Sequence, residues 1–282
     1  MGDSTVHDLL SDAVALLIKS GVDTPALDAE LLLAEAVGLS RTFVIAHPEY
    51  VPSGEHRVRF LELLNRRSER MPLAYILRRR EFYGLEFEVG PGVLVPRPET
   101  ERLVETAVAV LSGAQRAIAD IGVGSGAIAV SLAVSLPNAQ VYGTDTTQVS
   151  LDMARRNAER HRVADRVHLG LGDLFQPLKG LRFDAVVSNP PYIPSADIAG
   201  LQPEISLYEP KDALDGGRDG LDYYRRIIPS ARTFLQPGGW LLVEVGSNQA
   251  KDVCEMFRES GYEELQVVND YAGLERVVLG HM

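Results

Sequence analysis

The strongest constraint in this sequence is a regular alternation of strand-like and helix-like segments, which begins at Pro98 and continues to the end of the chain. Short runs of β-forming residues alternate with longer segments of helical periodicity. Such alternation predicts an α/β domain with a doubly wound, mostly parallel sheet and helices on both faces. The expected seven strands are 117–121, 140–144, 167–171, 183–188, 240–245, 265–268 and 276–279, and the expected helices are 98–111, 126–136, 149–161, 221–235 and 249–260.

The chain before this domain has a different character. Residues 1–75 show helical spacing and helix-end signals, among them an N-cap at Thr24 followed by Pro25, and a C-terminal stop at Gly38. Residues 81–96 combine aromatic and β-branched residues with turn glycines, which predicts a β-hairpin. We therefore expect a small helical domain at 1–75, a hairpin linker at 76–96 and the α/β domain at 97–282.

A third long helix is expected from Ser53 to Arg70, with Val58, Leu61 and Leu64 on one face. Arginines occupy its other positions: Arg57, Arg59, Arg66, Arg67 and Arg70. Such a set fits a solvated helix face, or a docking surface for an acidic partner or RNA. The sequence leaves both interpretations open.

Charge and cysteine content narrow the class of protein. Lys and Arg number 28 against 39 Asp and Glu, so the net charge is −11, which disfavours a protein that coats duplex nucleic acid. Cys254 is the single cysteine and lies in an amphipathic pattern, which predicts a buried, inert thiol. The segment Met1–Ser4 lacks an apolar signal region, and no apolar run approaches membrane-spanning length. We expect a cytoplasmic protein.

A glycine-rich loop follows the first strand of the α/β domain: Gly122, Val123, Gly124, Ser125 and Gly126. Glycines there permit a tight turn and let a ligand approach the backbone. The pattern is GxGxG and not the dinucleotide fingerprint GxGxxG, because Ala127 stands where that fingerprint has its third glycine. This spacing favours S-adenosylmethionine over a dinucleotide.

Acidic residues follow the next two strands. Asp145 ends the second strand, where a carboxylate can accept hydrogen bonds from both ribose hydroxyls. Asp173 ends the third strand, where it can accept from an adenine amine while Leu174 packs or donates its backbone N–H. Ligands at successive strand ends share one edge of a parallel sheet, so together they predict a nucleoside site.

The fourth strand ends in Asn189, Pro190, Pro191 and Tyr192. Paired prolines alone indicate a rigid turn. The Asn189 side-chain oxygen and a neighbouring carbonyl can also hold both hydrogens of one planar NH2 group, against which Tyr192 can pack. Held so, the nitrogen points towards a sulfonium methyl. Methyl transfer of this kind depends largely on positioning, and we expect no metal and no covalent nucleophile.

These motifs resemble a class I S-adenosylmethionine-dependent methyltransferase acting on a planar nitrogen. Four further segments narrow the resemblance to the PrmC/HemK family, the peptide chain release factor N5-glutamine methyltransferases: Glu81–Gly84, Val95–Glu101, Ala213–Gly217 and Asp270–Arg276. The similarity covers essentially the whole chain. One departure is Val123, where many members have threonine.

The resemblance implies methylation of the glutamine in the Gly-Gly-Gln loop of class 1 release factors, with S-adenosylhomocysteine as the product. It places the cofactor on Gly122–Gly126, Asp145, Asp173, Leu174 and Asn189. It gives catalysis to Asn189, Pro190 and Tyr192, and the target amide to Asn189–Tyr192. Arg97, Pro98 and Glu99 would lie near the cofactor, and the helical domain would recognise the substrate. We expect a monomer with no stable nucleic acid or membrane partner.

Three alternatives remain at this point. An adenine N6-methyltransferase acting on DNA or RNA shares the Asn-Pro-Pro-Tyr motif, although the acidic charge disfavours it. A non-catalytic S-adenosylmethionine sensor would have no need of Asn189 or Tyr192. An NAD-dependent oxidoreductase is disfavoured by the spacing of the glycine loop.

Overall fold

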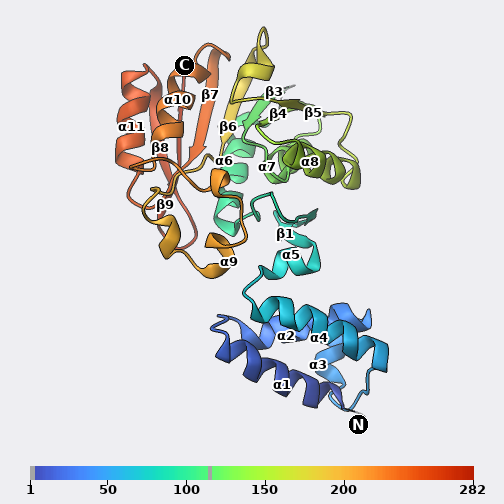
Figure 1. Cartoon of the computed structure of the whole chain (residues 1–282). Coiled ribbons are helices and arrows are strands. Elements are labelled where there is room, and N and C mark those ends of the chain that lie inside the picture. Colours follow the sequence, from blue (N-terminus) through green and yellow to red (C-terminus); the bar gives the residue numbers. More distant parts are fainter. Residues whose placement is uncertain (1–3, 114–115) are drawn as a thin grey trace. The chain divides into compact units, whose positions relative to one another are not determined.

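The protein was analysed as a computed structural model, which describes residues 4–113 and 116–282. The prediction that no signal segment is present depends partly on Met1–Asp3, which lie outside the described residues. The chain divides into two compact units. One contains Met1–Arg78 together with Gln202–Tyr208, and the other contains Arg79–Leu201 and Glu209–Met282 (Figure 1). No helix among the described residues is long and apolar enough to cross a membrane.

The first unit is helical, as the sequence predicts. A capping box between Thr5 and Asp8 begins its first helix. Ser53 accepts a hydrogen bond from the His56 N–H, 3.2 Å away, and so caps the fourth. Gly38 ends the second helix at φ 69°. The helices are α1 (Val6–Lys19), α2 (Pro25–Val37), α3 (Arg41–Ala46), α4 (Gly54–Ser68), α5 (Leu73–Leu77) and the short α9 (Pro203–Ser206).

Thr24 occupies the N-cap position of α2, but its side chain does not cap the helix. Its hydroxyl instead donates to the Asp28 carboxylate, 2.8 Å away in the first turn. Asp28 is buried and also accepts from Arg67, so this threonine helps to solvate a buried carboxylate. The position of the helix start was predicted correctly, and the role of the side chain was not.

The predicted apolar face of α4 is wrong at Val58 and Leu61 and correct at Leu64. Val58 and Leu61 are 59% and 49% exposed, whereas Phe60, Leu64 and Arg67 are buried. The buried positions follow the spacing i, i+4 and i+7, so they form one stripe of the helix. Arg67 is not on a solvated face, because it lies in this stripe and pairs with Asp28 at 2.6 Å. The helix also ends at Ser68, two residues before the predicted end.

A charged cluster brings a distant segment into the helical unit. Glu204, in α9, pairs with Arg67 at 2.8 Å and with Arg70 through both of its oxygens. Burial alone would raise the pKa of Glu204, but hydrogen bonds from the two guanidinium groups outweigh it and lower that pKa. Tyr208 donates to the Glu69 carbonyl at 2.6 Å. Part of the arginine set on 54–70 is therefore occupied by internal ion pairs.

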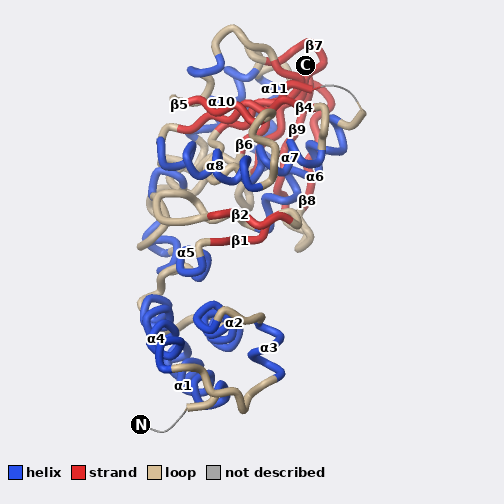
Figure 2. The backbone as a smooth tube through the Cα atoms, turned by 90° about the vertical axis from the view of Figure 1, so that its right-hand side faces the viewer, coloured by secondary structure: helices blue, strands red, loops and turns tan. Residues whose placement is uncertain are grey.

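The second unit begins with the hairpin of β1 (Arg79–Phe82) and β2 (Leu85–Glu88), which are antiparallel (Figure 2). Tyr83 and Gly84 form its turn, both at positive φ, as a tight two-residue hairpin requires. The sequence predicts β structure up to Val95, but the second strand ends at Glu88. The residues that follow form a loop in which Gly90 and Gly92 interrupt the strand pattern.

The remaining strands form one seven-stranded sheet in the order β5-β4-β3-β6-β7-β9-β8 (Figures 1 and 2). The first five in this order are parallel, and β9 is antiparallel to both β7 and β8. The predicted fold class is therefore confirmed. The strands are β3 (Arg116–Ile121), β4 (Ala139–Asp145), β5 (Val167–Leu171), β6 (Phe183–Ser188), β7 (Leu235–Glu244), β8 (Glu263–Asn269) and β9 (Glu275–His281).

The helices between the strands follow the prediction within a few residues. They are α6 (Glu101–Leu111), α7 (Ala127–Ser135), α8 (Gln148–Arg160), α10 (Asp222–Ala231) and α11 (Ala250–Glu259). A 3-10 turn, η1 (Pro98–Thr100), precedes α6. One boundary differs clearly: Leu235, predicted in a helix, begins β7 and pairs with Phe183. Its side chain is buried against the sheet, so its apolar character reflects strand packing.

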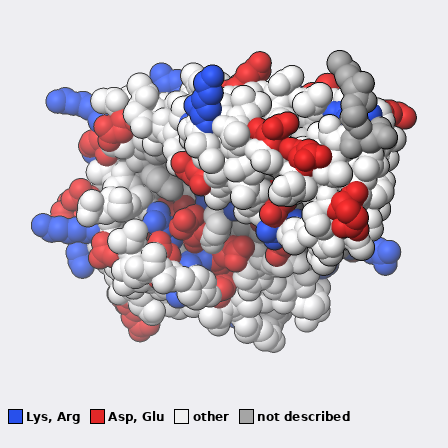
Figure 3. All heavy atoms as spheres, turned by 90° about the horizontal axis from the view of Figure 1, so that it is seen from below, with Lys and Arg blue, Asp and Glu red and all other residues white. Residues whose placement is uncertain are grey.

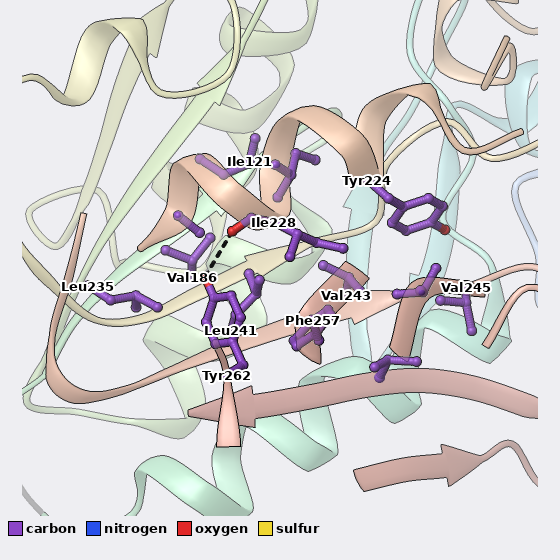
Figure 4. Close-up of a cluster of buried hydrophobic side chains, with 14 of the residues drawn as sticks. Ile121, Val186, Tyr224, Ile228, Leu235, Leu241, Val243, Val245, Phe257 and Tyr262 are labelled. Atoms are coloured by element: carbon purple, nitrogen blue, oxygen red, sulfur yellow. Dashed lines mark hydrogen bonds between the residues drawn. The ribbon is translucent and has the colours of Figure 1, made fainter. Parts of the chain in front are cut away.

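The main core lies between the sheet and helices α10 and α11 (Figure 4). Tyr262 is buried there with its hydroxyl donating to the Ile228 carbonyl at 3.0 Å. Tyr224 donates likewise to the Glu244 carbonyl at 2.8 Å. Cys254 is buried in this core, and burial raises the pKa of its thiol, in agreement with the predicted inert cysteine.

The segment between Tyr192 and Asp219 contains short turns of helix: η3 (Ile198–Gly200), α9 and η4 (Lys211–Ala213). Ile193 bridges to Asp215, and the Gly216 N–H donates to the Ile193 carbonyl at 2.8 Å. These contacts close the base of the loop next to the end of β6. A further turn, η2 (Gln176–Leu178), follows β5.

Candidate active site

A single pocket in the second unit collects the ends of four parallel strands. It is lined at the carboxyl ends of β3, β4, β5 and β6 by the glycine loop, Asp145, Asp173 and Asn189. This is the edge at which doubly wound sheets bind ligands. The segment Pro96–Thr100 and the insertion after β6 complete the wall, the latter with Pro210, Asp212 and Ala213.

The glycine loop is held by backbone hydrogen bonds. The N–H groups of Gly122 and Val123 both donate to the Thr144 carbonyl, at 2.9 and 2.8 Å. Gly122, Gly124 and Gly126 all have positive φ, which explains three glycines at alternate positions. Gly126 does not line the pocket: it precedes α7, and a Cβ there would lie 3.0 Å from Ala154 Cα.

Asp145 faces this loop from the end of β4. Its Oδ2 accepts from the Gly124 N–H at 3.0 Å, and its Oδ1 accepts from the Thr147 N–H at 3.0 Å. Oδ1 also accepts from the Thr147 hydroxyl at 3.2 Å. A carboxylate has about four acceptor positions, so Oδ2 retains acceptor capacity towards the pocket. These backbone hydrogen bonds orient the carboxylate and leave it able to accept a hydrogen bond from a ligand.

Asp173 and Leu174 line the pocket at the end of β5, as predicted. The Gly172 N–H donates to the Asp145 carbonyl at 2.9 Å, so the two acidic strand ends are linked. Leu174 adopts positive φ, an uncommon conformation for its residue type. Arg226 of α10 pairs with one oxygen of Asp173, a contact that no local pattern indicated.

Asp120 lies directly behind the loop and was not singled out from the sequence. It is fully buried, and neither carboxylate oxygen has a hydrogen-bonding side chain or backbone partner among the described residues. Burial, reinforced by the nearby Asp145, raises the pKa of Asp120 to about 7. Its place at the end of an apolar strand, separated from the GxGxG loop by Ile121 alone, was the available signal.

The Asn-Pro-Pro-Tyr segment divides between the pocket and the core. Asn189, Pro190 and Pro191 line the pocket, whereas Tyr192 is not among the lining residues. The Tyr192 hydroxyl donates to Glu244 Oε1 at 3.3 Å, and its backbone carbonyl accepts from Gln249 at 2.9 Å. Burial and the neighbouring carboxylate raise the pKa of Tyr192. The tyrosine therefore anchors the segment from behind.

The Val95–Glu101 segment supplies three lining residues, Pro96, Arg97 and Thr100, while Pro98 and Glu99 do not line the pocket. Arg97 pairs with Glu209 at 2.6 Å, and the same carboxylate accepts from the Val95 N–H at 3.2 Å. Glu209 is buried, which raises its pKa, although Arg97 opposes the shift. This pair ties the insertion after β6 to the segment before α6.

The Asp270–Arg276 motif is a structural support. Asp270 accepts from the backbone N–H groups of Ala272 and Leu274, at 2.9 and 3.0 Å, and pairs with Arg276. Arg276 also donates to the Val245 carbonyl at 3.1 Å. The motif thus closes the turn before β9 and fixes the end of β7.

Residues 8–77 match the family model described as the PrmC N-terminal domain, and residues 99–200 match the one described as the methyltransferase small domain. A release factor glutamine methyltransferase of Geobacter sulfurreducens is 46% identical, covering 99% of this chain and 97% of its own length. One of Moorella thermoacetica is 44% identical, covering 98% of each chain.

The chain belongs to the release factor glutamine methyltransferase family. The predicted resemblance is confirmed, and this family member is a methyltransferase. Solved structures support the fold. A methyltransferase from Pyrococcus furiosus has a TM-score of 0.53 and 20% identity, covering 71% of this chain and 89% of its own. The catalytic domain of hMettl16 in complex with an RNA hairpin has a TM-score of 0.57 and 17% identity, covering 80% and 81%.

For this family member, local patterns identified the strand-end residues and missed the groups that come from elsewhere. Pro210, Asp212 and Ala213 reach the pocket from the insertion, and Tyr223 and Ile227 reach it from α10. Glu244 lies behind Asn189–Tyr192 at the end of β7. An acid that ends an otherwise apolar strand, Leu241–Val243, is the signal that could have found Glu244.

Proposed function

We propose that this protein transfers the methyl group of S-adenosylmethionine to the side-chain amide nitrogen (N5) of the glutamine in the Gly-Gly-Gln motif of class 1 release factors. The products are the methylated glutamine and S-adenosylhomocysteine. The observation that carries this proposal is that the glycine loop, the two strand-end acids and Asn189 line one pocket in a chain of this family. Cofactor and target amide would meet there.

The residues around the pocket fit the cofactor. Asp145 would accept from the ribose hydroxyls, and Asp173 and Leu174 would hold the adenine. Positive φ at Gly122 and Gly124 leaves the loop backbone open to close approach, and a Cβ built at either position meets nothing within 4 Å. Bound S-adenosylmethionine supplies a methyl group on a sulfonium, which is an excellent leaving group.

The Asn189–Pro191 segment would hold the target amide. The Asn189 Oδ1 and the Pro190 carbonyl can each accept one hydrogen of a planar NH2 group. Prolines at 190 and 191 have fixed φ and no N–H, so this stretch presents acceptors in a rigid arrangement. Orientation of this kind supplies much of the rate in a displacement between two bound groups. The methyl group replaces one hydrogen, which leaves as a proton.

The helical unit would recognise the release factor. The net charge is −11, and on the face drawn in Figure 3 acidic and basic side chains of the described residues are interspersed without a continuous basic band. A protein substrate fits such a surface better than duplex nucleic acid does. We infer a monomer that acts in the cytoplasm, where translation takes place, with no stable nucleic acid or membrane partner.

The direct test incubates the protein with S-adenosylmethionine and a class 1 release factor, followed by mass spectrometry of the Gly-Gly-Gln peptide. We expect a mass gain of one CH2 on the glutamine. Asn189→Ala should abolish this gain while S-adenosylmethionine still binds in a calorimetric titration. Labelled methyl transfer to duplex DNA or rRNA, with none to the release factor, would instead support an adenine N6-methyltransferase.

A further inference from the structure

Glu244 is a buried carboxylate next to the Asn-Pro-Pro-Tyr segment that the proposed chemistry leaves unused. It is the last residue of β7, which lies parallel to β6, and Val243 is paired with Ser188 in the ladder. Glu244 and Asn189 directly follow this pair along the chain, so they lie next to each other at the same end of the sheet. The Glu244 side chain is fully buried, and Oε1 accepts from the Tyr192 hydroxyl at 3.3 Å. Burying a carboxylate costs free energy, so we expect this one to have a role at the site that compensates for the cost.

The side chain of Asn189 is held by a hydrogen bond to Thr100. The Asn189 Nδ2 donates to the Thr100 hydroxyl oxygen at 3.0 Å. With its NH2 end engaged in this way, the side chain has its Oδ1 left as an acceptor. A reversed side chain would offer N–H to a substrate NH2 group, and two donors cannot form a hydrogen bond. The orientation of this one amide therefore decides whether the pocket can hold the substrate.

A threonine hydroxyl alone cannot select that orientation, because it both donates and accepts. It could donate to Oδ1 as readily as it accepts from Nδ2. If the hydroxyl hydrogen is donated to another group, however, the Thr100 oxygen can only accept from Asn189, which selects the orientation with Nδ2 towards Thr100. The Thr100 hydroxyl is close enough to the Glu244 carboxylate to favour its ionised form, and Glu244 Oε2 is buried with no hydrogen-bond partner among the described residues, so it is free to accept one. An ionised carboxylate only accepts, so it would take the Thr100 hydrogen.

The surroundings of Glu244 come from four elements. Arg276 of β9 and Tyr192 favour the ionised carboxylate, whereas burial and Glu99 of η1 disfavour it. Tyr224 of α10 donates to the backbone carbonyl of Glu244 and faces the same group. The balance raises the pKa of Glu244 to about 7, so its protonation state changes near neutral pH.

We propose that Glu244 and Thr100 are positioning residues that act in series to fix the Asn189 amide with Oδ1 directed at the substrate, while Glu244 also holds Tyr192. The carboxylate takes the threonine hydrogen, the threonine oxygen then accepts only from Asn189 Nδ2, and Oδ1 remains for the target amide. Charge-assisted hydrogen bonds of this kind are the strong ones, so the chain is polarised in one direction. This inference rests on the proposed function, because it deepens the role of the same site.

The experiment compares Thr100→Val, Thr100→Ser, Glu244→Gln and the Thr100→Val/Glu244→Gln double variant with wild type. Valine keeps the shape of threonine without the hydroxyl, serine keeps the hydroxyl, and glutamine places a donor where the carboxylate had none. Methyl transfer to a release factor gives kcat and KM between pH 5.5 and 9, a range chosen to bracket about 7. S-adenosylmethionine affinity is measured by calorimetry as a control for folding.

We expect Thr100→Val and Glu244→Gln each to lower kcat/KM by about 10- to 100-fold, as supporting residues of a site commonly do. S-adenosylmethionine affinity should stay within about threefold, and Thr100→Ser should restore most of the activity. The double variant should cost no more than the worse single variant, because both changes break one chain. Wild-type kcat/KM should rise with pH as Glu244 ionises, and Glu244→Gln should lose this limb.

Additive losses in the double variant, or unchanged kcat/KM in Glu244→Gln with cofactor affinity preserved, would overturn the inference. If Glu244→Gln fails to fold, the comparison of Thr100→Val with Thr100→Ser still tests the inference, because equal kcat/KM in the two variants would overturn it. The Asn189 orientation is also measured without substrate, from NMR contacts between its side-chain NH2 hydrogens and the Thr100 methyl group. Those contacts should be lost in Glu244→Gln. A wild-type protein that shows them but does not methylate the release factor refutes the proposed function alone.

Discussion

Two carboxylic acids, Asp120 and Glu244, lie fully buried near the ends of β3 and β7, the two neighbours of β6 in the sheet. Both have a pKa raised to about 7, mainly because burial disfavours their charged form. They differ in what compensates for burial. Thr100, Arg276 and Tyr192 favour the ionised form of Glu244, whereas for Asp120 the backbone of Ala129 is the group that does so. At the residue scale, burial keeps both carboxyl groups partly protonated near neutral pH, where exposed carboxyl groups would be ionised.

These two acids should make the protein less stable as pH rises. The folded state holds a proton up to about pH 7, whereas the unfolded chain releases it near 4.5 for Glu244 and 3.8 for Asp120. Their contribution is thus most favourable below the unfolded values and is lost as pH rises to about 7. For Glu244 the gap corresponds to about 3 kcal/mol of unfolding free energy.

Urea unfolding at pH 5 and pH 8 measures this effect. Glu244→Gln and Asp120→Asn, which cannot ionise, should each reduce the fall in stability between the two pH values, and the double variant should reduce it further. An unchanged fall in the double variant would mean that both groups are ionised in the folded protein at pH 5.

At the scale of elements, α9 shows how a short segment can be held by charge. It has only four residues, Pro203–Ser206, and none of them is buried. Glu204 nevertheless pairs with Arg67 and Arg70, whose side chains are 7% and 17% exposed. Two arginines that look like part of a surface set in the sequence therefore serve the interior of the helical unit.

Removal of the Glu204 carboxylate should destabilise the helical unit. We expect Glu204→Ala to cost about 3 kcal/mol, because Arg70 would lose its carboxylate partner and Arg67 would keep only Asp28. The measurement is chemical unfolding monitored by circular dichroism at 222 nm, which reports helix. Glu30→Ala breaks the pair with the half-exposed Arg41 and should cost less than about 1 kcal/mol. Equal losses in the two variants would contradict the buried role of Glu204.

At the scale of the whole molecule, the residues that line the pocket all belong to the second unit. The first unit contributes none of them, although its segment Gln202–Tyr208 comes from the insertion that follows β6. Cofactor binding and recognition of the protein substrate are therefore separable in principle, because they would use different units.

A fragment that starts at Arg79 should test this separation. We expect it to bind S-adenosylmethionine within about threefold of the full chain, because every lining residue is retained. Methyl transfer to the release factor should fall by about 100-fold or more, because the recognition surface is gone. Calorimetry and methyl incorporation measure the two quantities on the same preparation. A fragment with full transfer activity would refute the recognition role proposed for the helical unit.

Local patterns predicted most strands of the sheet within one or two residues. The loop Gly122–Gly126, Asp145 and Asn189 could be placed because each directly follows a strand, and parallel strands end at a common edge. The errors arose where burial depended on a partner distant in sequence. Val58 and Leu61 are apolar but exposed, Arg67 is charged but buried, and Leu235 packs in a strand.

The sequence by itself determined the fold class, the order of the strands along the chain and the acceptor groups at their ends, because these depend on periodicity and on short-range turn chemistry. Only the tertiary structure decided which polar groups meet. Thr100, Asn189 and Glu244 are separated by many residues in the chain, yet they lie together because η1, β6 and β7 end at one place. Hydrogen bonds and ion pairs act over a few ångströms, so their partners are chosen by packing and cannot be read from spacing alone.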